Sequence, residues 1–460
     1  MIVMKFGGTS VEDAAAIRRI TGIVSTHRDR KPVVVLSACA GVTNQLLDAA
    51  ELAATGQRNE ATRLITAIAD RHKAIAHDLF TNSQRAGIVT DIDRCREELS
   101  VLVTGVAILG ELTPRSLDAF ASYGERLSTL VVHSFIAGSG LRSRLVDARS
   151  FMVTDDHFTK AAPQFDLVHQ RLMEVIPPAL HDHDVVVTQG FIGATAGGIP
   201  TTIGRGGSDY SAAIIGALLD AEDIQIWTDV DGILTADPTI VSGARRIKVM
   251  SFNEAAELAY FGARVLHPET ILPAVRKNIP VHVLNSLRPE SPGTMITASP
   301  AVDRRCIVKS IAYKEGITLI SIVSTRMFLA HGFLENVFDV FHKYRTVLHT
   351  VATSEVSISV TIDNRTHLDS IAQELRAFAT VSVSGQKAII CVVGENLKTT
   401  PGVAARVLHA VAEVNINMIS QGASEINISF VVDEHDIEPV VQNLHREFFA
   451  NPSAFPEVFE

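Results

Sequence analysis

Cysteine is scarce in this sequence, and there is no excess of positive charge. Four cysteines occur in 460 residues, and none belongs to a CxxC pair. A disulfide framework or a cysteine zinc site is therefore not expected, and a reducing, cytoplasmic setting is the simplest one. The formal net charge of −10 argues against nucleic acid as a partner, because clustered Lys and Arg bind phosphate backbones.

Long apolar runs are absent as well. No stretch approaches the roughly 18 consecutive apolar residues of a membrane-spanning helix, and the N-terminus shows no basic and then apolar leader. We therefore expect a cytoplasmic protein without a membrane partner. Hydrophobic residues make up 47% of the chain and charged residues 20%, which is typical of a globular protein, and 460 residues predict two or three domains.

Short β-branched runs are spread over the first 290 or so residues. Five of them are predicted strands: Ile2–Phe6, Val33–Ser37, Asp184–Thr188, Ile224–Thr228 and Val281–Leu284. Continuous apolar strands that alternate with longer helical patterns predict a parallel or mixed sheet covered on both faces. Residues 45 to 120 have helical spacing but no motif, so we expect a helical insertion packed beside this sheet.

The C-terminal third contains an internal repeat. "ATSEVSISVTID" at 352–363 returns as "GASEINISFVVD" at 422–433, and the same offset of 70 residues pairs Gly332 with Gly402. Each copy reads strand, glycine-started helix, strand, strand, so a small α/β module is duplicated. The Pro-rich stretch "NSLRPESPGTMI" that ends at Ile296 predicts the approach to a linker before the repeat.

Two glycine-rich turns could bind an anion. In "VMKFGGTSVED", Lys5 ends an apolar run and precedes Gly7 and Gly8, so it either faces a phosphate cradle or is a solvated strand end. In "TIGRGGSDYSAAIIGALL", Arg205 and a glycine turn precede a predicted helix start at Ser208, whose exposed N–H groups favour anions. A plain N-cap is the alternative there, but it needs neither three glycines nor an arginine.

Three further stretches carry candidate chemistry. "WTDVDGILTADP", 227–238, places aspartates and a glycine after a strand, which suits a nucleotide site or an Asp-capped loop. "SACAGVTN", 37–44, is another small-residue turn after a strand. In "SYGERLST", 122–129, Glu125 is either a cleft residue that holds a substrate ammonium or a surface residue in a first helical turn.

Together these stretches resemble the amino-acid kinase family and, within it, the monofunctional aspartate kinases of the lysine-sensitive type. The motifs that carry the resemblance are, in order, "KFGGTS", "AGVTN", "GERLS", "TQGFIG", "GRGGSDYSA", "WTDVDG", "FGARVLHP" and the pair "SEVSIS" and "SEINIS". The resemblance implies an α/β amino-acid kinase fold, an open and mainly parallel sheet between helices, followed by two α+β ACT domains of βαββαβ type. The expected boundaries are 1–292 for the kinase domain, 293–312 for a linker, and 313–385 and 386–460 for the ACT domains.

The resemblance also implies an activity. Such enzymes transfer a phosphoryl group from ATP to the β-carboxylate of L-aspartate, the first step toward lysine, threonine and methionine, and they assemble as homodimers or homotetramers through ACT domains that bind an amino-acid effector. A carboxylate acceptor with a pKa of about 3.9 is already ionised, so no general base is needed. Mg²⁺ would be held mainly by the phosphates of ATP rather than by a protein metal site.

Site residues follow from the matched motifs. Lys5 and Asp209 would be catalytic, Lys5 against the transferring phosphoryl group, while Arg205 would bind the substrate carboxylate and Glu125 the substrate amino group. The aspartate pocket would also contain Thr43, Phe191 and Ser208. The ATP site would comprise Lys5, Gly7, Gly8, Thr228, Asp229, Gly232, Leu234 and Arg264. The effector site, with lysine as the leading effector, would comprise Met327, Leu334, His349, Ser354 and Glu355.

Four positions depart from the family pattern. Arg264 replaces a lysine, Leu234 a tyrosine and Thr239 an arginine. The resemblance therefore does not imply which contacts these three residues make with adenine and phosphate. His349 replaces an aspartate of lysine-sensitive relatives, and a histidine is a poor partner for a lysine ammonium. Two alternatives remain: another carboxylate kinase of this fold, acting on glutamate or N-acetylglutamate, and a catalytically weak amino-acid sensor built on the ACT pair.

Overall fold

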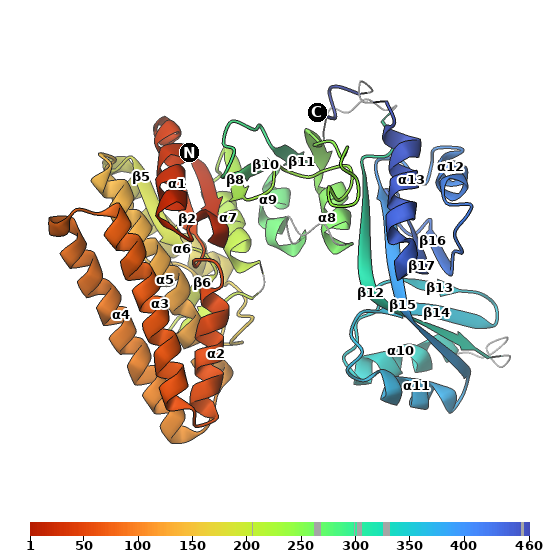
Figure 1. Cartoon of the computed structure of the whole chain (residues 1–460), viewed down its shortest axis with the longest axis horizontal. Helices are drawn as coiled ribbons and strands as arrows, with labels where there is room; N and C mark the ends of the chain where they lie inside the picture. Colours follow the sequence, from red (N-terminus) through yellow and green to blue (C-terminus); the bar gives the residue numbers. More distant parts are fainter. Residues whose placement is uncertain (205, 262–267, 299, 301–305, 325–331, 452–454) are drawn as a thin grey trace. The chain divides into compact units, whose positions relative to one another are not determined.

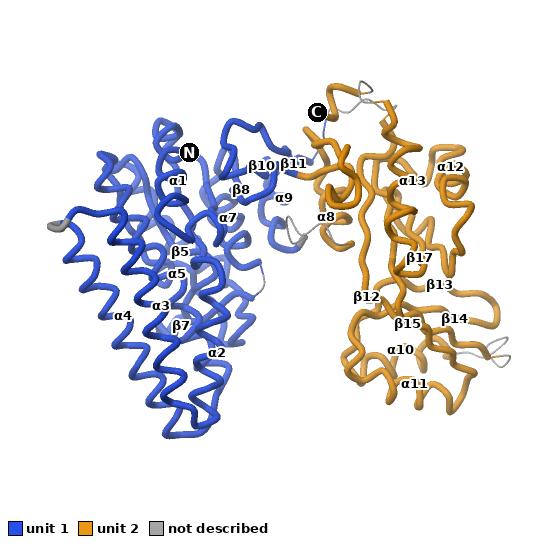
Figure 2. Tube along the Cα trace, in the orientation of Figure 1, with its two compact units in different colours: residues 1–232, 265–300 blue, residues 233–264, 301–460 orange. Residues whose placement is uncertain are grey.

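The computed structural model describes residues 1–204, 206–261, 268–298, 300, 306–324, 332–451 and 455–460. Arg205, Arg264 and Met327, named above as site residues, lie outside these ranges. The chain forms two compact units, one of residues 1–232 with 265–300 and one of residues 233–264 with 301–460 (Figure 2). The segment 233–264 thus groups with the C-terminal modules, whereas the domain boundaries expected from the sequence stay predictions.

The first unit is built on an open, mainly parallel sheet, as expected. Its strands lie in the order β3-β5-β2-β1-β8-β10-β11, in which only the β10–β11 pair is antiparallel. Their bounds are β1 Ile2–Phe6, β2 Val33–Leu36, β3 Ser143–Leu145, β5 Val185–Gln189, β8 Asp223–Thr228, β10 Val281–Asn285 and β11 Thr294–Thr297. All five predicted strands are confirmed to within one residue at either end, because buried parallel strands are continuous apolar runs.

Helices cover both faces of this sheet. Ile2, Met4 and Phe6 of β1 share one core with α1 (Ala14–Thr26) and α5 (Pro114–Gly138). On the opposite face, α7 (Gly207–Leu218) approaches so closely that a Cβ on Gly216 would lie 2.6 Å from Ile224. The helices α6 (Phe165–Asp182) and α9 (Leu272–Lys277) contact α7. The alternation of side chains along a strand therefore gives each helix layer its own apolar surface.

The predicted helical insertion is confirmed. It comprises α2 (Val42–Ala54), α3 (Arg58–Leu79) and α4 (Asn82–Leu109), which run side by side with α5 (Figure 1). Apolar positions at helical spacing, such as Ile65 and Ile68 of α3, join the core beneath the sheet. A small separate sheet of β4 (Val153–Thr154), β6 (Ile192–Thr195) and β7 (Pro200–Thr202) carries the chain toward α7.

The second unit is built on one six-stranded antiparallel sheet in the order β13-β14-β12-β15-β17-β16. The strands are β12 Ser310–Val323, β13 Val351–Thr353, β14 Ser357–Ile362, β15 Thr380–Val393, β16 Met418–Gln421 and β17 Asn427–Asp433. The helices are α8 Phe252–Tyr260, α10 Phe333–Lys343, α11 Leu368–Arg376, α12 Val403–Ala410 and α13 Ile437–Phe449, and the short strand β9 (Val249–Ser251) precedes α8.

The internal repeat is confirmed with its offset of 70 residues. β12 begins at Ser310 and β15 at Thr380, and both strands are 14 residues long. The two glycine-started helices are capped by Gly332 and Gly402 in the left-handed region, with φ of 83° and 84°. β12 and β15 pair with each other, so the two modules share one continuous sheet. Each copy ends in a helix, α11 or α13, that the repeat pattern had not included.

Within the described residues, no helix is long and apolar enough to cross a membrane.

Candidate active site

A cavity of about 330 Å³ opens at the carboxyl ends of β1, β2 and β5 in the first unit. It is lined by Lys5, Gly8, Ser37, Ala38, Cys39, Ala40, Gly41, Thr43, Glu125, Phe191, Gly204, Gly206, Gly207, Ser208 and Asp209. This edge is where parallel α/β sheets bind ligands, because loops from several strands converge there. The structure thus brings four motifs together in one wall: the turn after Lys5, the 37–44 turn, Glu125 and the turn before α7.

Lys5 and Asp209 form an ion pair inside this cavity. Lys5 Nζ lies 2.6 Å from Asp209 Oδ1, and the two side chains are only 11% and 14% exposed. Asp209 belongs to the first turn of α7, whose N-cap, Gly206, has a φ of 69°. Lys5 is therefore not a solvated strand end. Its ammonium faces the N-terminus of a helix, where unpaired N–H groups stabilise negative charge.

Glu125 lies deep in the wall of the cavity. Its Oε1 accepts a hydrogen bond from the Ala38 amide at 3.0 Å, and its Oε2 has no hydrogen-bond partner among the described residues. The residue is 3% exposed, and burial raises the pKa of its carboxyl to about 8. It also lies about three turns into α5, so the alternative of a surface glutamate in a first turn is wrong. A buried acceptor without a partner is suited to a substrate ammonium.

Close approaches of backbone shape the cavity. A Cβ on Gly124 would lie 2.8 Å from the Ala38 Cβ, and a Cβ on Gly190 would lie 2.7 Å from the Ser208 Cβ. Real Cβ atoms do not come this near, so glycine at these positions lets α5 and α7 reach the turns after β2 and β5.

Phe191 occupies the cavity in a strained backbone conformation. Its φ of 61° lies in the left-handed region, which a bulky residue rarely adopts. The Phe191 amide donates to Ser211 Oγ of α7 at 3.0 Å, and the ring packs so tightly on Gly207 that a Cβ there would lie 2.6 Å from it. Contacts with α7 therefore hold the Phe191 ring beside the turn that precedes this helix.

Asp118 supports the site from behind and was missed by sequence reasoning. It lies on α5, about two turns before Glu125, and is 1% exposed. Its carboxylate accepts from the Thr202 amide at 3.0 Å, the Thr202 hydroxyl at 2.6 Å and the Thr159 amide at 2.9 Å. Burial raises its pKa. Asp118 thus anchors the start of the "TIGRGGSD" turn, and its spacing of seven residues from Glu125 on one helix face was the available signal.

The predicted nucleotide residues lie partly beside this cavity and partly elsewhere. Thr228 ends β8 and Asp229 follows it, next to the Lys5 turn, where the Gly7 amide donates to the Trp227 carbonyl at 3.1 Å. Gly232 has a φ of 114°, and a Cβ there would lie 2.5 Å from Thr294 Oγ1, so only glycine fits. Leu234 belongs to the second unit.

Two of the aspartates in "WTDVDGILTADP" are structural. Asp231 accepts from Asn285 Nδ2 at 2.6 Å, and Asp237 accepts from the Thr239 amide at 2.8 Å. Asp237 therefore caps its own loop, which was one of the two alternatives for this stretch. Asp229 is exposed.

The predicted effector residues that the structure describes lie in the first ACT-like module. Leu334 is exposed at the start of α10, and Ser354 and Glu355 are exposed on the turn between β13 and β14.

His349 is already engaged by other side chains. Its Nδ1 lies 2.8 Å from the Tyr260 hydroxyl, its Nε2 lies 3.0 Å from Asp363 Oδ2, and Lys314 Nζ lies 3.2 Å from the same Nε2. Burial lowers the pKa of the His349 imidazole. The neutral ring has no negative charge to attract the ammonium of a lysine effector, and the Lys314 ammonium already lies beside it.

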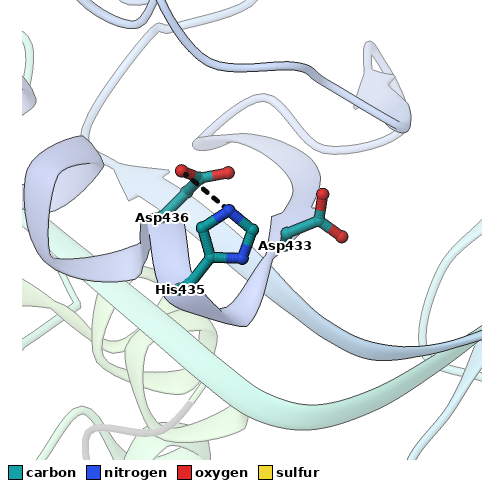
Figure 3. Close-up of side chains that lie close together, drawn as sticks. All are labelled: Asp433, His435 and Asp436. Carbon is teal, nitrogen blue, oxygen red and sulfur yellow. Dashed lines mark ion pairs between the residues drawn. The ribbon is translucent and has the colours of Figure 1, made fainter.

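One group of three side chains among the described residues has the composition of a metal site (Figure 3). Asp433, His435 and Asp436 lie close together at the end of β17. Asp433 is paired with Lys387, and the His435 side chain is 80% exposed beside Asp436. Because Asp433 already has Lys387 as its partner, we assign this group no ligand.

A second cavity of the first unit, about 460 Å³, lies over β8 and β10. Its floor carries Asp223, whose carboxylate is 2.6 Å from His282 Nδ1 and 3.5 Å from Arg30. Gln225 Nε2 donates to the same carboxylate at 2.9 Å. The polar groups of this floor therefore bind one another.

Comparison with known proteins places these features in a family. Residues 1–285 match the amino acid kinase family and residues 390–448 match the ACT domain. The chain is 39% identical to aspartokinase 1 of Arabidopsis thaliana, a chloroplastic protein, over 97% of this chain and 80% of the relative. It is 37% identical to lysine-sensitive aspartokinase 3 of Escherichia coli over 98% of this chain and 99% of the relative.

Solved structures give the same result. Escherichia coli aspartokinase III in complex with aspartate and ADP superposes with a TM-score of 0.84 at 37% identity, covering 98% of this chain and all of that one. The same enzyme in complex with lysine and aspartate gives a TM-score of 0.83. The chain belongs to the amino acid kinase family and, within it, to the aspartokinases.

Proposed function

We propose that this protein transfers the γ-phosphoryl group of ATP to the β-carboxylate of L-aspartate, giving ADP and 4-phospho-L-aspartate, and that an amino-acid effector, lysine, inhibits it through the ACT modules. The observation that carries the proposal is one cavity that contains a Lys5–Asp209 pair at the N-terminus of α7 and a buried Glu125 with an unpartnered oxygen. The aspartate and ADP bound to the related structure support the same reading.

Each charged residue of the cavity is assigned a separate role in phosphoryl transfer. The acceptor carboxylate is already ionised, so the barrier lies in bringing two negative groups together. Lys5 and the N–H groups at the start of α7 neutralise the phosphoryl oxygens, and Asp209 holds the Lys5 ammonium in place. Glu125 holds the substrate ammonium. We assign the α-carboxylate to Arg205, whose fork suits a carboxylate.

Mg²⁺ would enter with the nucleotide. Of the carboxylates that line the cavity, Asp209 is paired with Lys5 and Glu125 is buried against Ala38. Because Glu125 is assigned to the substrate ammonium, we propose that the phosphates of ATP carry the cation. When bound, Mg²⁺ would neutralise part of the negative charge on the phosphates.

Assembly and location are part of the proposal. We propose a homodimer or homotetramer formed through the ACT modules, because Leu334, Phe338 and Val356 expose apolar surface there. We propose a cytoplasmic location because the thiols of Cys39 and Cys391 are free and buried, as in a reducing compartment.

The test is turnover by the purified chain. MgATP and L-aspartate should release ADP, and hydroxylamine should trap the acyl phosphate as a hydroxamate. Glutamate and N-acetylglutamate are assayed in parallel. N-acetylglutamate has no ammonium for Glu125 and should be the poorest substrate. Faster turnover of either compound than of L-aspartate would contradict the proposal, and tight lysine binding without any turnover would favour an amino-acid sensor.

A further inference from the structure

Two backbone turns of the candidate active site are tied to each other. The turn after β1 contains Gly8 and Val11, and the turn after β2 contains Cys39 and Ala40. The Ala40 amide donates to the Gly8 carbonyl at 3.2 Å, and the Cys39 thiol donates to the Val11 carbonyl at 3.1 Å. A Cβ on Gly8 would lie 2.9 Å from the Ala38 carbonyl oxygen, so the turns pack without free space.

Arg71 of α3 bridges the same two turns from outside the cavity. Its Nη1 donates to the Ala40 carbonyl at 2.7 Å, and its Nη2 donates to the Glu12 carbonyl at 3.2 Å. The residue is partly buried and does not line the cavity. It belongs to the helical insertion, in which the sequence shows no motif. One planar guanidinium therefore holds both turns through two of its N–H groups.

The bridged carbonyl lies at a sensitive point of the chain. Ala40 immediately precedes Gly41, the N-cap of α2, which has a φ of 80° and no side-chain cap. Thr43 is in the first turn of that helix, and two residues before Ala40 the Ala38 amide binds Glu125. A shift of the Ala40 peptide would therefore displace the backbone that leads to Thr43 and the Ala38 amide that donates to Glu125.

We propose that Arg71 is a positioning residue for the aspartate subsite: it fixes the 37–41 turn, and through it Glu125 and Thr43, in the geometry that binds the substrate. The inference rests on the proposed function. Misplacement of a binding group by about 1 Å can cost roughly 100-fold in rate, so a clamp outside the cavity can govern binding within it. The competing explanation is that Arg71 only fastens the insertion to the domain.

Kinetics separate the two explanations. Arg71→Met removes both hydrogen bonds while it keeps the length and apolar stem of the side chain. The control is Arg63→Met on the same helix, because the Arg63 side chain is 74% exposed and, among the described residues, pairs with Glu60 in the adjacent turn. We expect Arg71→Met to raise the KM for aspartate by about tenfold or more and to leave the KM for ATP within about twofold. Arg63→Met should leave both constants unchanged.

Arg71→Lys is the conservative variant. Its ammonium is a point charge that can satisfy one carbonyl but cannot match the geometry of a fork. We expect an aspartate KM between those of the wild type and Arg71→Met. This variant also keeps the proposal testable if Arg71→Met does not fold.

Hydrogen exchange gives a readout that does not depend on turnover. Peptides that cover 37–45 should exchange faster in Arg71→Met than in the wild type and Arg63→Met, while peptides from β8 should not change. If wild-type protein shows no turnover, the proposed function fails, and the exchange data still decide whether Arg71 holds the turn. An unchanged aspartate KM would overturn the inference. Equal losses for aspartate and ATP with a lower melting temperature would overturn it in favour of a structural role.

Discussion

Lys5 places a positive charge beside Asp209 in the first turn of α7, where the phosphoryl group is expected. Lys5→Met should lower kcat by roughly 100- to 1,000-fold, because the ammonium acts mainly on charge that develops in the transition state, and should change the KM for aspartate by only a few fold. The hydroxamate assay measures both constants. Lys277→Met is the control, since that ammonium forms an exposed pair with Asp220. A variant that kept its kcat and lost only aspartate affinity would contradict this role.

We expect the proposed role of Glu125 to make aspartate binding depend on pH. Burial raises the pKa of its carboxyl from 4.5 to about 8, so the free protein holds a proton there at pH 7. An ammonium bound beside the carboxyl favours the ionised form, and binding must therefore release that proton. The KM for aspartate should fall as the pH rises from about 6 to about 8. The stability that this raised pKa contributes is complete below pH 4.5 and is lost as the pH rises through 8.

Calorimetry in buffers of different ionisation enthalpy counts the released proton. The wild type should release a fraction of a proton approaching one per aspartate bound at pH 7, and Glu125→Gln, which cannot ionise, should release none and bind aspartate more weakly. Buffer-independent heats for the wild type would show that Glu125 is already ionised or does not meet the ammonium.

At the scale of elements, α8 is fastened to the second sheet by a buried ion pair. Ser251 and Glu254 form a capping box at the start of α8, and Lys309, just before β12, places its Nζ 2.7 Å from Glu254 Oε2. Both charged side chains are fully buried. Burial raises the pKa of Glu254 despite its ionic partner, which shows how little water reaches the pair.

Removing one partner of this pair should lower the free energy of unfolding much more than replacing both partners. Lys309→Met leaves a buried carboxylate without a counter-ion and should lower the free energy of unfolding by about 3–5 kcal/mol, whereas Glu254→Gln with Lys309→Met should recover most of that loss. Denaturant unfolding of the full chain measures both. Lys343→Met, which breaks an exposed pair with Glu374, should hardly move the midpoint. A double variant as unstable as Lys309→Met would show that the pair itself is stabilising.

At the scale of the whole molecule, regulation depends on which effector the ACT modules bind. His349 is held by Tyr260 and Asp363 with Lys314 beside it, so the wild type lacks the carboxylate that a lysine ammonium would prefer at this position. We expect weak inhibition of aspartate-dependent turnover by lysine. His349→Asp should lower the inhibitory lysine concentration by about tenfold, or roughly 1.4 kcal/mol.

Threonine and S-adenosylmethionine are the controls in this assay, and their effects should not respond to His349→Asp. If the variant left lysine inhibition unchanged while threonine or S-adenosylmethionine inhibited the wild type, another effector would be indicated.

The sequence by itself determined the elements. Strand positions, the helical insertion, the repeat with its glycine caps and the position of Lys5 at a strand end all depend on neighbouring residues, because apolar periodicity and left-handed glycines act within a few positions. The resemblance of eight ordered motifs then indicated the family and named the cavity residues. Of those, Arg205 lies outside the described part of the chain.

Only the tertiary structure decided the environment of each side chain. Burial raises the pKa of Glu125, yet its hydrogen-bond partner Ala38 is 87 positions away in sequence. Asp118 and Arg71 contact turns of the candidate active site from positions outside the motifs, and His349 forms hydrogen bonds with residues of other elements. Desolvation and hydrogen-bond geometry depend on packing between distant segments, and no local pattern in the chain specifies which segments meet.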